Sequence, residues 1–157
     1  MKRLTGTSLP PIPEKSFVWL NMTEHITFVI PGELYSSKNS RLPLIRRKGG
    51  KLKLSVVKSR AAQRHEAELI GQLHRNPAFT AAWLKEFALK DKPVRLLVRI
   101  YRGNARRFDY INICQNLFDC LVKAELLPDD DADSLIPVFE PYKIDRANPR
   151  TELTILP

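Results

Sequence analysis

The hydrophobic pattern changes from an alternating to a helical period between residues 93 and 126, and this change constrains the fold more than any other feature. Residues 93–102 (PVRLLVRIYR) alternate as a half-buried strand does, with two arginines on the outer face. Residues 109–126 repeat at the helical period instead, which predicts an amphipathic helix. The polar stripe of this helix is expected to contain Asp109, Asn112, Gln115, Asn116, Asp119 and Lys123.

The rest of the chain predicts one α+β domain over residues 25–157, preceded by an irregular extension at 1–24. Helical composition marks residues 58–74 and 77–90, with Ser59 and Pro77 at their starts. The first strand is expected at 25–32 and the last two within 134–144 and 151–156, and Gly49-Gly50 is expected to join two short extended pieces of a basic loop. The expected order is β-(β)-α-α-β-α-β-β, a mixed or antiparallel sheet covered by helices.

Bulk properties exclude several classes of protein. The chain of 157 residues has no apolar run long enough to span a bilayer, and its first residues lack the apolar core of a signal peptide. Cys114 and Cys120 are expected on one helix, too poorly placed for a disulfide. These features indicate a cytoplasmic protein.

Charge is divided unevenly along the chain, whose formal net charge is +9. Residues 1–108 contain 22 Lys and Arg against 7 Asp and Glu, whereas residues 109–157 contain 4 against 10. Residues 34–65 contain ten basic residues and no acid. A solvated surface is the ordinary explanation of a short charge run, but such surfaces normally mix both signs. A basic stretch of this kind indicates attraction to phosphate backbones.

Four aspartates crowd the stretch LLPDDDADSLI at residues 126–136, namely Asp129, Asp130, Asp131 and Asp133. Carboxylate oxygens are the ligands that Mg²⁺ prefers, and a bound metal lets carboxylates face a phosphate without repelling it. Phosphodiester hydrolysis also needs an activated water and relief of negative charge, both of which a metal supplies. The acidic turn of a basic chain is therefore a candidate metal site for nucleic-acid hydrolysis.

Residues 106–130 resemble the motif of the RusA family of Holliday-junction endodeoxyribonucleases, and residues 31–39 resemble the early loop of that family. In element order the resemblance covers about residues 25–157. The motif residues that match are Arg107, Asp109, Asn112, Asp119, Leu121, Ala124, Asp129 and Asp130. Two positions differ from the family pattern, since Ile111 replaces its second aspartate and Gln115 replaces its helix lysine.

The resemblance implies a homodimeric, Mg²⁺-dependent nuclease that cuts four-way junctions or other branched DNA, with Mn²⁺ as an alternative ion. It implies Asp109 and Asp130 as catalytic metal ligands, with Asp129 as a further ligand and Asn112 in support. Candidate DNA contacts are Arg46, Arg47, Lys48, Arg106, Arg107 and Asn39. A non-catalytic DNA-binding protein of the same fold is the main alternative, and a scaffold whose acidic turn binds Ca²⁺ is a third.

The length of the expected helix predicts that the metal site is formed by two subunits. Asp109 precedes the helix and Asp130 follows it, so about 17 residues separate the two carboxylates by roughly 25 Å. One ion cannot bridge that distance. We therefore expect Asp109 of one subunit to meet Asp129 and Asp130 of another across a two-fold axis.

Overall fold

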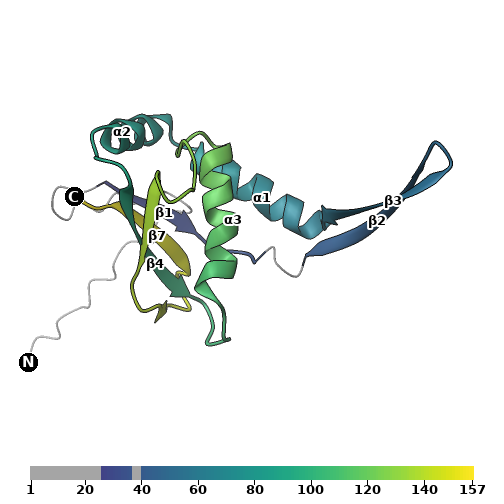
Figure 1. Ribbon diagram of the computed structural model, residues 1–157. Helices are drawn as coiled ribbons and strands as arrows, with labels where there is room; N and C mark the ends of the chain where they lie inside the picture. Colours follow the sequence, from purple (N-terminus) through teal and green to yellow (C-terminus); the bar gives the residue numbers. More distant parts are fainter. Residues whose placement is uncertain (1–25, 37–39) are drawn as a thin grey trace, which may run out of the picture.

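The computed structural model describes residues 26–36 and 40–157 (Figure 1). The expected N-terminal extension at 1–24 and the candidate DNA contact Asn39 lie outside the described residues. The element order is β1–β2–β3–α1–α2–β4–α3–β5–β6–β7, which confirms the α+β class.

A mixed sheet of five strands forms one layer of the molecule. Its strands are β1 (Thr27–Pro31), β4 (Val94–Arg102), β5 (Leu135–Phe139), β6 (Lys143–Ile144) and β7 (Arg150–Ile155). Strand β7 lies antiparallel between β1 and β4, whereas β5 and β6 pair with β4 in parallel. The segment expected to be one strand at 134–144 is therefore two, because β5 and β6 each pair with a different part of β4.

Three helices follow the expected boundaries closely, and each begins at a side chain that accepts a backbone hydrogen bond. They are α1 (Arg60–Leu73), α2 (Pro77–Ala88) and α3 (Tyr110–Lys123). Ser59 accepts from the amide of Ala62 at the start of α1, which confirms the expected cap. Pro77 occupies the first turn of α2, where its missing N–H is not needed.

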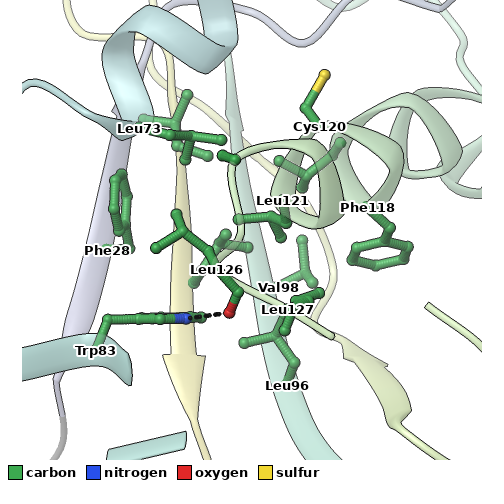
Figure 2. Packing of buried hydrophobic residues seen from close by; sticks show 14 of the residues in the cluster. Phe28, Leu73, Trp83, Leu96, Val98, Phe118, Cys120, Leu121, Leu126 and Leu127 are labelled. Carbon is green, nitrogen blue, oxygen red and sulfur yellow. Dashed lines mark hydrogen bonds between the residues drawn. The ribbon is translucent and has the colours of Figure 1, made fainter. Parts of the chain in front are cut away.

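The hydrophobic core lies between the helices and one face of the sheet, and Figure 2 shows part of it. Strand β4 contributes its expected inward residues, and Trp83 of α2 is fully buried while its indole donates to the carbonyl of Leu126 at 3.0 Å. Two expectations are wrong in detail. Leu97 is buried although it alternates outward, and Asn116 of the expected polar stripe is buried because α3 packs against α1.

Residues 41–58 form a hairpin that stands apart from the main sheet, and we call this hairpin the arm (Figure 1). Its strands are β2 (Arg41–Lys48) and β3 (Lys51–Lys58), each of eight residues. Gly49 and Gly50 form the turn with φ of 58° and 76°, which confirms the turn position and matches a type I′ hairpin. The expected basic loop is thus a regular two-stranded sheet.

The root of the arm is held by a charge cluster around Glu66. The carboxylate of Glu66 receives hydrogen bonds from Lys58, at the end of β3, and from Lys123, at the end of α3. Burial alone would raise the pKa of Glu66, but the two lysines outweigh it and hold that pKa below its usual value. Glu66 therefore ties the arm and α3 to α1.

We expect Glu66→Gln to destabilise the protein at neutral pH, because two lysines lose their anionic partner. The loss should be only about 1–2 kcal/mol, because water partly screens the charge of Lys123. A lowered carboxyl pKa stabilises the fold above the unfolded value of 4.5, and this contribution is lost as pH falls through the folded value. Urea unfolding at pH 7 and at pH 3 measures the difference between variant and wild type. An equal loss at both pH values would contradict the ion-pair explanation, and Glu68→Gln, on the same helix, is the control.

Candidate functional site

The N-terminal end of α3 places Asp109 as the helix cap. Its Oδ1 accepts from the amide of Ile111 and its Oδ2 from the side chain of Asn112, both at 2.9 Å. Asp109 and Asn112, two of the three expected catalytic residues, therefore lie in direct contact. Arg106 and Arg107 are exposed in the loop just before them. This end of α3 presents a carboxylate beside two cations.

The C-terminal end of α3 turns the chain sharply into the aspartate-rich segment. Glu125 adopts a left-handed conformation with φ of 58°, and the amide of Leu126 returns to the carbonyl of Leu121 at 2.9 Å. This arrangement is a Schellman motif with an acid where glycine is usual. His74 forms a hydrogen bond with the carbonyl of Ala124 at 3.0 Å, and the indole of Trp83 donates to the buried carbonyl of Leu126 at 3.0 Å. Helices α1 and α2 thereby hold the start of the turn in place.

The aspartates of the turn have different local roles. Asp131 accepts from the amide of Ser134 at 2.8 Å and so closes the turn before β5. Asp129 accepts from the amide of Asp130 at 2.8 Å, which fixes the two residues relative to each other. Asp130 and Asp133 are exposed. This hydrogen bond therefore holds Asp129 and Asp130, the two expected metal ligands of the turn, next to each other.

Asp130 lies in an unfavourable environment for its own charge. Partial burial and the nearby carboxylates of Asp119 and Asp129 raise its pKa above the usual 3.8. Asp119 belongs to the last full turn of α3, and the chain brings Asp130 back beside it after the Schellman motif. A carboxylate cluster under mutual repulsion is an arrangement that a bound cation would stabilise.

One chain does not bring all the expected ligands together. Asp109 and Asp130 lie beyond opposite ends of α3, whose 14 residues rise by about 21 Å. Within residues 26–36 and 40–157, no three of the Asp, Glu, His and Cys side chains gather in a group that could hold a metal ion. The carboxylate oxygens of Asp129 and Asp130 suit Mg²⁺ chemically. A complete ligand set needs at least one further group.

The arm is strongly basic, and its charges face one another. Residues 41–58 contain seven Lys and Arg and no acid. The strand register sets two cations opposite each other in three of the eight cross-strand pairs, which destabilises a hairpin unless an anion lies nearby. These pairs are Arg41 with Lys58, Arg46 with Lys53, and Lys48 with Lys51. Glu66 is such an anion for Lys58. Arg46 and Arg47 are exposed as expected, and the side chain of Lys48 lies outside the description.

The two faces of the arm differ, a feature that the sequence pattern was not used to predict. The strand register places Arg46 and Lys53 on one face, with the exposed Leu42, and a row of aliphatic side chains on the other, next to Arg47. The aliphatic row consists of Ile45, Leu52, Leu54 and Val56, which are 66%, 67%, 67% and 64% exposed, together with Pro43. An exposed row of this size marks an interaction surface. Alternation within 52–56 was the signal that could have revealed it.

Comparison of the sequence with protein-family models and with curated proteins finds no match. No helix in the described part of the chain is long and apolar enough to cross a membrane.

Proposed function

We propose that this protein is a homodimeric, Mg²⁺-dependent endodeoxyribonuclease of the RusA type that cuts four-way junctions or other branched DNA. The proposal rests on the observation that like charges lie close together at two places in the chain. Cations oppose one another across the arm, and partial burial together with the carboxylates of Asp119 and Asp129 raises the pKa of Asp130. A nucleic-acid backbone relieves the first arrangement and a divalent cation relieves the second.

In this proposal each metal site takes residues from two subunits. Asp129 and Asp130 of one subunit would hold the ion together with Asp109 of the other, and Asn112 would keep the Asp109 carboxylate oriented through their hydrogen bond. A bound Mg²⁺ would supply an activated water and neutralise charge on the phosphate. Arg106 and Arg107, beside Asp109, would bind the phosphates next to the scissile bond.

The arm supports the dimer because its aliphatic row needs a partner surface. Two arms facing each other would bring together fourteen cations, twice the seven of one arm, so the row is better matched by the acidic part of a second copy. Residues 109–157 contain 10 acids against 4 cations, and Ile111 and Ile136 are exposed there. The aliphatic row of one subunit would then cover this acidic part of the other.

We expect the double substitution Leu52→Ser and Leu54→Ser to convert the dimer to a monomer, because both side chains would leave the proposed interface. Light scattering after size exclusion gives the mass, and junction cleavage should fall with it. Leu89→Ser, at a residue that is 72% exposed outside the arm, is the matched control. A double variant that stays dimeric and fully active would contradict the role of the arm.

The direct test of the function uses a synthetic four-way junction and a linear duplex, each with and without Mg²⁺. Cleavage of the junction alone, only with the metal, supports the proposal.

A non-catalytic DNA-binding protein is the second candidate. It is favoured by the use of both Asp109 oxygens in the helix cap and by the lack of a three-ligand metal group within the described residues. This candidate predicts tight, metal-independent binding of the junction without any cleavage.

A further inference from the structure

A cavity of about 230 Å³ lies at the junction of β1, α1 and α3, away from the acidic turn. The chain leaving β1 forms one wall and the inner sides of the two helices form the others. Ser59, the cap of α1, donates its amide to the carbonyl of Ser40 at 2.6 Å, which places the root of the arm beside this cavity. The cavity is lined by residues 30–35 and by His65, Glu68, Leu69, Gln72 and Asn116.

Two carboxamides line the cavity, and the oxygen of one of them is buried without a partner in the described part of the chain. The Oε1 of Gln72 has no hydrogen-bond partner among the described residues. A folded chain rarely leaves such a group unpaired, because its desolvation is not offset. Asn116, which is only 4% exposed, also lines the cavity. The Gln72 oxygen is therefore available to a ligand that enters the cavity, with the Asn116 side chain as a second polar group of the lining.

Two aromatic side chains that line the cavity stack on each other. The rings of Tyr35 and His65 have centroids 4.4 Å apart and planes 12° from parallel, so each ring covers one face of the other. The hydroxyl of Tyr35 forms a hydrogen bond with Ser40, which fixes the ring beside the arm. The outer face of such a stack suits a planar ligand, since aromatic faces stack on planar rings.

The charge of the cavity favours a neutral ligand over a free phosphate. Glu33 and Glu68 both line it, and no lysine or arginine is among its described lining residues. Glu33 is held by the amide of Gly103 at 2.8 Å and the side chain of Asn104 at 2.9 Å, and its carboxylate also lies 3.4 Å from the guanidinium of Arg102. Glu68 is exposed and can accept a hydrogen bond from an amino group. These features suit a neutral, planar ligand with donors and acceptors along its edge.

We propose that this cavity binds a single unpaired nucleobase of the DNA held by the arm. The base would stack on an outer face of the Tyr35–His65 pair and present its polar edge to Gln72 and Asn116, as carboxamides pair with base edges in general. This inference rests on the proposed function, and it names the feature of branched DNA that this part of the protein recognises.

Binding of free nucleosides tests the cavity without any DNA cleavage. Adenosine, cytidine, guanosine and thymidine are titrated separately into the full-length protein without metal and followed by NMR. We expect at least one to bind, and Gln72→Leu to weaken it about tenfold by removing an edge partner. Gln115→Leu, on the exposed side of α3, is the matched control. Failure of all four nucleosides to bind, or equal affinity in Gln72→Leu, would overturn the inference.

A second measurement uses duplex DNA with one unpaired base and the same duplex with an abasic site there, again without metal. The base should strengthen binding several-fold in the wild type and add nothing in Gln72→Leu. The melting temperature of Gln72→Leu should not fall, since the lost oxygen has no partner. If nucleosides bind but junctions are never cut, the proposed nuclease activity fails and the cavity inference stands. If junctions are cut with Mg²⁺ but the two metal-free duplexes bind equally well, the cavity inference alone is overturned.

Discussion

Asp130→Asn should abolish metal-dependent cleavage of a four-way junction while leaving junction binding intact. The substitution removes a charged metal ligand, and the loss of several kcal/mol of transition-state stabilisation lowers the rate by at least about a hundredfold. Binding should survive because the arm and the Arg106–Arg107 pair, which would carry the phosphate contacts in the proposed function, are unchanged. Single-turnover cleavage and a gel-shift assay on the same junction measure the two quantities separately. Asp133→Asn, an exposed aspartate of the same turn, is the control and should cut normally.

The same substitution should stabilise the metal-free protein at neutral pH. Burial and the neighbouring carboxylates raise the pKa of Asp130, so its charged form is less stable in the folded than in the unfolded chain. The neutral amide removes this penalty above the folded pKa. Below the usual value of 3.8 the carboxyl is protonated in both states, and the advantage should disappear. A melting temperature that is higher at pH 7 and equal at pH 3 confirms the repulsion, whereas no difference at pH 7 would contradict it.

The parts of the fold that local chemistry determines were predictable from the sequence. Ser59 and Pro77 mark the starts of α1 and α2 because each suits the unpaired amides of a first helical turn. The alternation of 93–102 identifies β4, and Gly49-Gly50 identifies the turn of the arm, because its positive φ angles favour glycine. In each case the residue type and the local conformation explain each other.

The parts that depend on contacts between distant segments were not predictable. Asn116 has the position of an outward residue in the polar stripe, and only the packing of α1 against α3 buries it. Asp119 and Asp130 come together because Glu125 adopts a conformation that its residue type does not favour. The independence of the arm is likewise a matter of partners, since β2 and β3 pair with each other and with no strand of the main sheet. These three features of the tertiary structure define the surroundings of the candidate sites.

A mixture of two inactive variants should recover activity if each metal site is shared between subunits. Asp109→Asn and Asp130→Asn homodimers each lack a ligand in both sites. A mixed dimer contains one site with both aspartates intact and one site with neither, because each subunit supplies the residue that the other lacks. After unfolding and refolding together, about half of the dimers are mixed, so about a quarter of wild-type sites are restored.

The two arrangements of the site differ sharply in this experiment. If Asp109 and Asp130 acted within one chain, no mixed dimer would contain an intact site, and the mixture would stay as inactive as its components. Recovered cleavage should also consist of single nicks, since the second site of each mixed dimer lacks both aspartates, whereas the wild type should make paired cuts. Refolding each variant alone controls for the procedure. The recovery follows from the placement of the two residues beyond opposite ends of α3, a distance that one chain cannot close.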